Sequence, residues 1–150
     1  MKKTMLLSMF LLVVVLVAGL SSAAIGADSA PAECSDAAGC AVVKPGETIK
    51  LGVAGPITGE YAMYGEDISD AEKLAVEQLE PLHGFNWELL AEDTQGAAEA
   101  AVAVANKWIT DPSFVAVPGN VFTGETAATI PIFEKASIPM LSPSATGAEL

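Results

Sequence analysis

The chain alternates between short apolar runs and longer amphipathic stretches from residue 48 onward. Each short run ends at glycine, proline or an acidic residue, which is typical of β-strands bounded by turns. The predicted strands are TIKLGVAG (48–55), WELLAED (87–93), SFVAVPG (113–119) and IPMLSP (138–143).

A first helix is predicted over residues 69–84. Ser69 and Glu72 have the spacing of a capping box, in which each side chain satisfies a free backbone N–H at the helix start. Gly84 is a typical residue for the helix end. The pattern therefore predicts a strand followed by a helix.

Two further helices are predicted over residues 97–110 and 123–137. Asp93 or Thr94 is expected to cap the former, and Pro131 is expected to kink or shorten the latter. The apolar residues of the 97–110 helix recur at helical spacing on one face; they are Ala101, Val104, Ala105 and Trp108.

Strands that alternate with helices predict an α/β fold with a doubly wound parallel sheet and helices on both faces. In such sheets, ligands bind outside the carboxyl ends of the strands. Small, hydroxyl-bearing or glycine-containing loops follow three of the predicted strands, namely GPITGEYAMYG, PGNVFTGET and SPSATGAE. We therefore expect a binding site at this edge of the sheet.

The amino terminus has the pattern of a secretory signal. Two lysines precede an apolar stretch that is followed by small residues, and cleavage is expected before Ala27, with a second possible site before Ile25. Residues 1–26 are thus assigned to a signal peptide and 27–48 to a leader, which leaves 49–150 for the fold. The protein is expected in the periplasm or an equivalent extracytoplasmic compartment.

The charge of the chain excludes one class of partner. The sequence has 7 lysines, no arginine and 19 acidic residues; without the two lysines of the signal the net charge becomes −14. Such a protein repels phosphate backbones and anionic membrane surfaces. We expect no nucleic-acid partner.

Cys34 and Cys40 are the only two cysteines. In an exported chain two thiols usually pair, so a Cys34–Cys40 disulfide in the leader is predicted. A redox pair or a metal site is the alternative, although the single histidine, His83, is far away in sequence and disfavours zinc. No metal site and no cofactor are predicted.

Enzyme motifs are missing from the sequence. The first loop contains Gly52, Gly55, Gly59 and Gly65, yet neither G-x-G-x-x-G nor G-K-[ST] occurs, so nucleotide binding is not expected. No G-x-S-x-G elbow occurs either. The first loop either contains turn glycines alone or presents Tyr61 or Tyr64 to a ligand, and no enzymatic activity is predicted.

Hydroxyl groups at the sheet edge favour a carboxylate site. Thr123 lies at the start of a predicted helix, where the dipole and free N–H groups attract anions, and Ser144 and Thr146 follow the fourth strand. Each of the three hydroxyls could instead be only a helix cap. Glu125 opposes the proposal, since its charge would compete with an anionic ligand.

These segments resemble the leucine/isoleucine/valine-binding protein family, the exported binding components of ABC importers for branched-chain amino acids. The resemblance rests on IKLGVAGPITGEYAMYG, AAVAVANKWITD, GNVFTGET and IPMLSPSATGAEL, and runs from about Ile49 to Leu150. It implies that residues 49–150 are a partial N-terminal ligand-binding lobe, the first lobe of a two-lobed periplasmic binding protein that closes on a ligand. The second lobe is absent from the sequence, which is expected to be a fragment or a truncated gene product.

The resemblance also implies which residues bind the ligand. Thr123 matches the hydroxyl that binds the ligand carboxylate, although family members often have a second hydroxyl where this chain has Gly124. The implied partners are a small solute, such as an amino acid, and a membrane permease. A ligand-sensing domain of a receptor or regulator is the alternative function. The complete implied set of contacts is Tyr64, Val121, Phe122, Thr123, Ser144 and Thr146.

Overall fold

A computed structural model of the protein describes residues 35–36, 39–148 and 150. The predicted signal peptide and Cys34 lie outside this part of the chain, so signal cleavage and the Cys34–Cys40 disulfide stay predictions. The secondary structure consists of β1 (Ile49–Gly55), α2 (Ala62–Glu77), β2 (Trp87–Asp93), α3 (Ala98–Trp108), β3 (Phe114–Asn120) and α4 (Thr123–Lys135).

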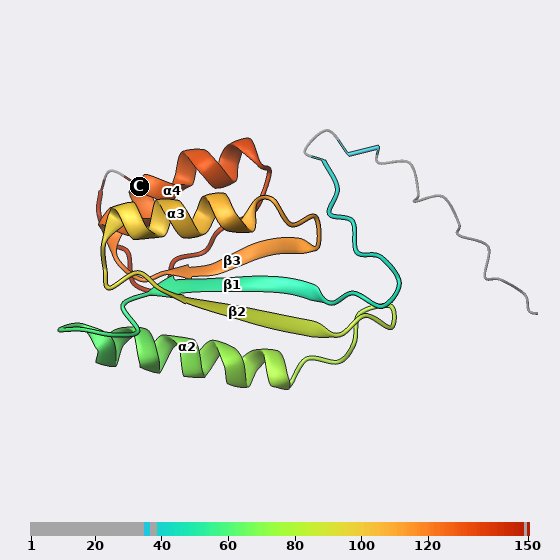
Figure 1. The fold of residues 1–150 in the computed structure, drawn as a ribbon, viewed down its shortest axis with the longest axis horizontal. Coiled ribbons are helices and arrows are strands. Elements are labelled where there is room, and N and C mark those ends of the chain that lie inside the picture. The colour runs from blue at the N-terminus through green and yellow to red at the C-terminus, as the bar shows by residue number, and fades with distance from the viewer. Residues whose placement is uncertain (1–34, 37–38, 149) are drawn as a thin grey trace, which may run out of the picture. The chain divides into compact units, whose positions relative to one another are not determined.

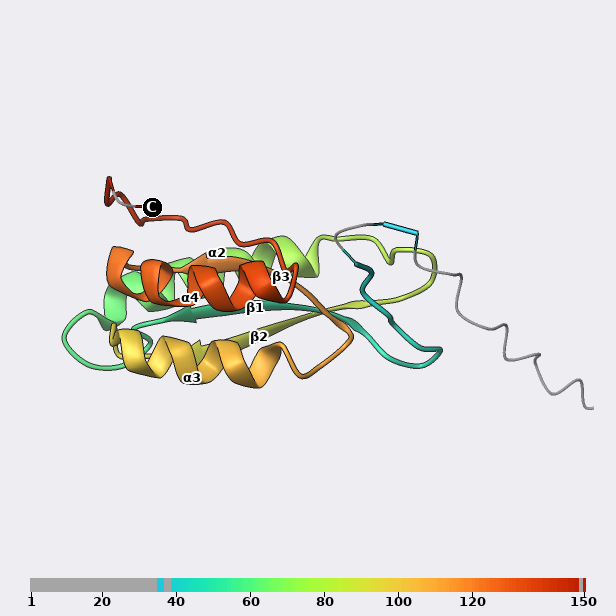
Figure 2. The same cartoon turned by 90° about the horizontal axis from the view of Figure 1, so that it is seen from above.

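The three strands form a parallel sheet in the order β2-β1-β3, and their arrows point the same way in Figure 1. Leu51 of β1 lies opposite Leu89 of β2 and Ala116 of β3. Helix α2 covers one face of the sheet, whereas α3 and α4 lie side by side on the other (Figures 1 and 2). The predicted α/β fold with a parallel sheet is confirmed.

The hydrophobic core lies between the sheet and the α3–α4 layer. The four residues predicted for the inner face of α3 are all buried there. Trp108 stacks on Phe114, with ring centroids 5.0 Å apart and planes inclined by 22°. A Cβ atom at Gly52 would lie 2.7 Å from both rings, so glycine in β1 leaves the space that this aromatic pair fills.

The first helix differs from its prediction at both ends. Ser69 and Glu72 lie inside α2, well past its first turn, so the predicted capping box is wrong. The helix begins earlier because Gly65 lets it approach the first loop: a Cβ atom there would lie 2.3 Å from the Pro56 carbonyl oxygen. Its end at Glu77 leaves His83 and Gly84, with φ of 53° and 88°, in a separate turn.

The predicted fourth strand is reduced to one parallel bridge between Val117 and Met140. Val117 N–H donates to Pro139 O, and Leu141 N–H donates to Val117 O, both at 2.9 Å. Proline lacks the N–H that would extend the ladder. Pro118 follows Val117 in β3, and Pro139 and Pro143 lie in the opposite segment. The pairing therefore stops after these two bonds.

Helix α4 continues through Pro131 rather than ending there. The proline removes the N–H that would bind the Ala127 carbonyl, and both residues lie on the exposed side of the helix. Water can therefore satisfy that carbonyl, which explains why the predicted shortening does not occur.

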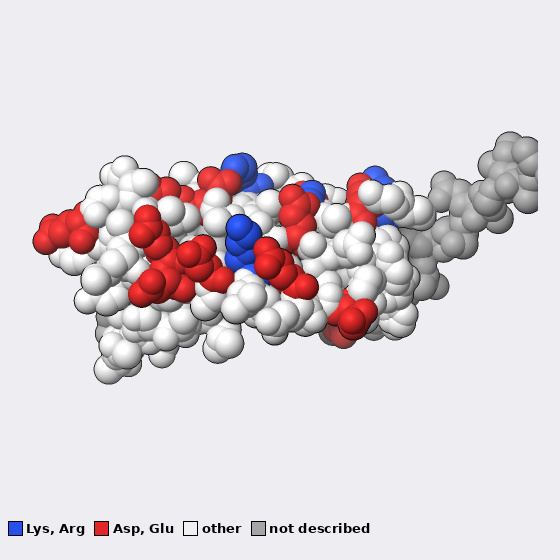
Figure 3. All heavy atoms as spheres, turned by 90° about the horizontal axis from the view of Figure 1, so that it is seen from below, with Lys and Arg blue, Asp and Glu red and all other residues white. Residues whose placement is uncertain are grey.

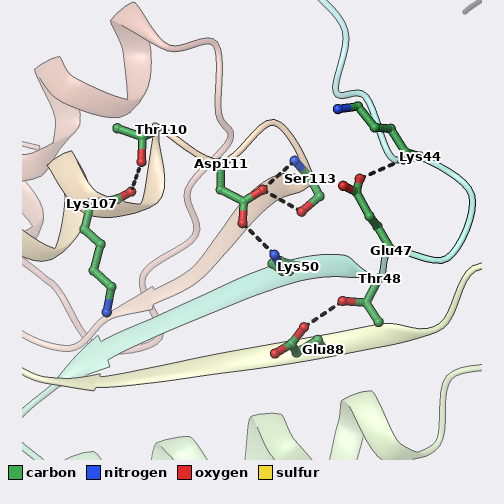
Figure 4. A network of polar contacts seen from close by, with 9 residues as sticks. All are labelled: Lys44, Glu47, Thr48, Lys50, Glu88, Lys107, Thr110, Asp111 and Ser113. Atoms are coloured by element: carbon green, nitrogen blue, oxygen red, sulfur yellow. Dashed lines mark hydrogen bonds and ion pairs between the residues drawn. The ribbon is translucent and has the colours of Figure 1, made fainter.

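Charged side chains hold the amino-terminal end of the sheet. Lys50 forms a 2.6 Å ion pair with Asp111, whose Oδ1 also accepts bonds from Ser113 (Figure 4). The hydrogen bond from Lys50, together with those from Ser113, lowers the pKa of Asp111 to about 2. This network lies away from the loops that follow the strands.

Most of the charged side chains on the α2 side of the molecule are acidic, with few lysines among the carboxylates (Figure 3). None of the helices in the described ranges is both long and apolar enough to cross a membrane.

Candidate functional site

The amino-terminal end of α4 lies at the carboxyl edge of the sheet, directly after β3. The first bond within this helix runs from Thr126 N–H to Phe122 O at 3.0 Å, so the N–H groups of Thr123, Gly124 and Glu125 have no partner inside the helix. A Cβ atom at Gly124 would meet nothing within 4 Å. This helix end is open and can accept an anion.

Thr123 connects this helix end to the last loop. Its Oγ1 accepts hydrogen bonds from the N–H groups of Thr146 and Gly147, each at 3.2 Å. The residue before it, Phe122, occupies the N-cap position without any side-chain cap, so Thr123 is not a capping residue. A hydroxyl that accepts two bonds keeps its own proton available to donate.

The last loop is anchored by Ser142 and presents two further hydroxyls. Ser142 Oγ donates to the carbonyl of Asn120 at 2.6 Å and accepts from Ala145 N–H at 3.0 Å. Ser144 and Thr146 are exposed, and their hydroxyls make no hydrogen bond within the described part of the chain. The structure therefore brings Thr123 and the last loop together and leaves the hydroxyls of Ser144 and Thr146 open to solvent.

Three aromatic rings cluster around Phe122, the residue before Thr123. Phe122 meets Tyr61 and Tyr64 edge to face, at centroid distances of 5.4 and 6.4 Å. Tyr61 and Tyr64 are 46% and 55% exposed, which leaves an aromatic surface next to the helix end. Val121 is fully buried, so its side chain reaches the core rather than this surface.

Asp93 fixes the first loop instead of capping α3, which corrects the prediction for this residue. Its Oδ1 accepts from Ile57 N–H at 2.9 Å and Thr58 N–H at 3.2 Å, and its Oδ2 accepts from the Thr58 hydroxyl. These hydrogen bonds, the one from the Thr58 hydroxyl above all, lower the pKa of Asp93. The first loop, which ends at Tyr61, is thereby held to the end of β2.

Glu125 points inward rather than toward the open helix end. Its side chain is fully buried, with Oε2 accepting from Phe122 N–H at 2.9 Å and Oε1 accepting from the Thr94 hydroxyl. Thr94 therefore does not cap α3 either, because α3 begins after Ala97 without a side-chain cap. The Glu125 carboxylate thus occupies the Phe122 N–H and leaves the N–H groups of Thr123 and Gly124 free for a ligand.

A groove lies between α2 and β2, on the other side of the sheet from α4. Its volume is about 610 Å³, and its lining includes Trp87 and Leu89 of β2 and Glu66 and Asp70 of α2. None of Thr123, Ser144 and Thr146 lines this groove, so it is not part of the site at the start of α4. No group of three or more His, Cys, Asp or Glu side chains suited to a metal occurs in the described ranges.

Comparison with known proteins identifies the family. A family model described as periplasmic binding protein matches residues 48–150. The chain belongs to the periplasmic binding protein family. It is 36% identical over 107 residues to the leucine-, isoleucine-, valine-, threonine- and alanine-binding protein of Pseudomonas aeruginosa, covering 69% of this chain and 28% of that relative. It is 31% identical to the Leu/Ile/Val-binding protein of Escherichia coli, covering 69% of this chain and 29% of that protein.

Solved structures of binding proteins share this lobe. The branched-chain amino acid transporter substrate binding protein LivJ of Streptococcus pneumoniae, in complex with isoleucine, has a TM-score of 0.63 at 30% identity, over 68% of this chain and 30% of its own. A Rhodopseudomonas palustris solute binding protein in complex with 4-hydroxybenzoate has a TM-score of 0.61 at 25% identity, over 69% and 28%. The chain thus spans less than a third of the length of the proteins it matches, and these relatives are named as binding proteins rather than enzymes.

The sequence and the family resemblance point to the hydroxyl residues and Tyr64 as ligand contacts, which stays a prediction, but they missed how the loops of these residues are held. The roles of Glu125 and Asp93 depend on contacts with distant loops. A signal for Glu125 did exist, because it stands three residues after Phe122, where a Glu side chain can bind the N-cap N–H.

Proposed function

We propose that this chain is the first-lobe part of the extracytoplasmic solute-binding component of an ABC importer, and that it binds a small carboxylate-bearing solute. Branched-chain amino acids are the first candidates, since the relatives named above bind them. The single observation that supports a carboxylate is the Thr123 hydroxyl, which accepts two backbone N–H bonds and keeps its proton at an open helix end.

The proposed contacts divide into a polar and an apolar part. Thr123, with the free N–H groups of α4, would receive the carboxylate, while Ser144 and Thr146 would bind it from the adjoining loop. Tyr64 and Phe122 would cover the apolar part of the solute. Val121 would support this surface from the core.

An aromatic carboxylate is a second candidate. The exposed rings of Tyr61 and Tyr64 around Phe122 favour a planar ligand, because aromatic rings attract one another edge to face. One structural neighbour also holds 4-hydroxybenzoate. A binding panel should therefore include leucine, isoleucine, valine, alanine and 4-hydroxybenzoate.

The Thr123→Ala variant tests the carboxylate site in the protein made from the complete reading frame. Loss of a hydrogen bond to a charged group is expected to cost about 1.5–3 kcal/mol, or about 10- to 100-fold in affinity. Calorimetric titration well below the melting temperature measures this loss. Thr123→Ser keeps the hydroxyl and is the matched control, and it should bind within about threefold of the wild type.

Substitutions in the adjoining loop complete the test. Ser144→Ala and Thr146→Val should weaken the same ligand and leave the ligand-free melt nearly unchanged, because their hydroxyls bind nothing in the described structure. If all three hydroxyl substitutions leave the affinity within about twofold, the carboxylate is bound elsewhere and the proposed site is wrong.

A further inference from the structure

We propose that Glu125 and Thr94 form a buried pair that positions the ligand-facing residues Phe122 and Thr123. This inference rests on the proposed function and concerns residues that do not themselves touch the ligand. Glu125 is 0% exposed and Thr94 is 1% exposed. The two oxygens of one carboxylate bind donors from different loops: the Thr94 hydroxyl after β2 and the Phe122 N–H after β3.

Thr94 connects this carboxylate to the rest of the sheet edge. Its own N–H donates to Gly55 O at 2.8 Å, at the end of β1. Its Oγ1 accepts from Gly96 N–H at 3.2 Å, and its carbonyl accepts from Ala97 N–H at 2.9 Å. The pair therefore joins the ends of β1, β2 and β3 at one point beneath the open helix end.

Phe122 connects the buried Glu125–Thr94 pair to the proposed ligand surface. Its N–H is fixed by Glu125, and its ring contacts both exposed tyrosines. A Cβ atom at Gly96 would lie 3.0 Å from the ring, so the loop after β2 also touches Phe122 directly. Thr123 is the next residue along the chain, and a shift of the Phe122 backbone would displace its hydroxyl.

Local helix capping does not explain the whole arrangement. A glutamate at this position of a helix usually binds the N-cap N–H from an exposed side chain, and needs no partner from another loop. Here the carboxylate is fully buried and takes a second donor from Thr94, a residue 31 positions earlier in the chain. Such an arrangement fixes two loops relative to each other as well as one helix end.

The Glu125→Gln variant tests the proposal because its amide carries one acceptor oxygen in place of two. With the amide oxygen on Phe122 N–H, the NH2 group faces Thr94, so the bond that the Thr94 hydroxyl donates to a carboxylate is lost or reversed to a weaker neutral one, and the start of α4 should loosen. Thr94→Val removes the hydroxyl that donates to Glu125 Oε1. Glu134→Gln is the matched control, since it removes the same charge from an exposed position near the other end of α4.

Two measurements separate positioning from simple stability. The first is the ratio of affinities for a carboxylate and its amide, using L-leucine with L-leucinamide, or 4-hydroxybenzoate with 4-hydroxybenzamide if that acid is the one that binds. We expect this ratio to fall about tenfold in Glu125→Gln and in Thr94→Val. The double variant should lose little more than either single one, because both substitutions break the same link.

The second measurement is hydrogen–deuterium exchange of the ligand-free protein. Exchange should rise together in residues 94–97 and 121–126 for both variants, and should stay at the wild-type level there for Glu134→Gln. If Glu125→Gln does not fold, Thr94→Val and its hydroxyl-retaining counterpart Thr94→Ser provide the same comparison.

The outcomes distinguish this inference from the proposed function. If no carboxylate in the panel binds the wild type, the proposed ligand class fails, while the exchange pattern still decides whether the pair couples the two loops. If exchange in 94–97 is unchanged and the affinity ratio stays within about twofold, Glu125 is a helix cap only and the inference is wrong.

Discussion

Glu72 should make the stability of the protein fall as pH rises through neutrality. This half-buried side chain of α2 lies over β3, because a Cβ atom at Gly119 would be 3.1 Å from its Oε1. Its Oε2 and the Ser69 hydroxyl one turn earlier are both buried without a partner in the described structure. Burial raises the pKa of Glu72 from 4.5 to about 7.

The sign follows from proton binding. Between pH 4.5 and about 7 the folded protein holds a proton on Glu72 that the unfolded chain releases, so unfolding becomes easier as pH increases. At about 1.4 kcal/mol per pH unit the upper limit is about 3 kcal/mol. Because the residue is only half-buried, solvent screening reduces this, and we expect about 1–2 kcal/mol.

The isosteric variant Glu72→Gln isolates this contribution. Urea unfolding of both proteins at steps between pH 4.5 and 8 gives the difference in their free energies of unfolding, from which the other titrating groups cancel. The variant should be close to the wild type at pH 4.5 and more stable by about 1–2 kcal/mol at pH 8. Glu77→Gln, at an exposed position of the same helix, shows the effect of losing one negative charge. A difference for Glu72→Gln that stays constant over this range would refute the reasoning.

Two more predictions concern the scaffold and the leader. Gly65→Ala should destabilise the protein by about 1–3 kcal/mol although alanine favours helices, because its Cβ would lie 2.3 Å from the Pro56 carbonyl; urea unfolding measures this, and a stability equal to wild type would show that the loop yields. A thiol assay on unreduced, denatured protein should find no free thiol if Cys34 and Cys40 pair, and two free thiols would exclude the disulfide.

The contacts that hold the proposed site were beyond prediction from the sequence. Asp93 and Thr94 stand at the end of β2 and precede a helix, so local pattern favours capping. Their side chains instead bind Thr58 of the first loop and Glu125 of α4. Side chains at a strand end can serve either purpose with similar energy. Only the folded arrangement, which brings the first loop and the start of α4 within reach, decides between them.

The effect of each proline on secondary structure could not be predicted from the sequence for a related reason. Pro131 is tolerated in α4 because it faces solvent, whereas Pro118, Pro139 and Pro143 limit the pairing of the 138–143 segment. Their effect depends on whether the missing N–H or the unsatisfied carbonyl is exposed or required by a neighbour. The sequence shows the residue but not its surroundings.

Periodicity along the chain was sufficient to determine the strand–helix alternation, the parallel sheet and the buried face of α3. These features depend on the spacing of apolar residues, and the burial of those residues is the dominant favourable contribution to folding. The start of α2 depended on the close approach of Gly65 to Pro56, and the inward orientation of Glu125 depended on a threonine 31 residues away. Such choices are made by tertiary contacts, because a buried carboxylate or a helix end takes whichever partner the packed chain supplies.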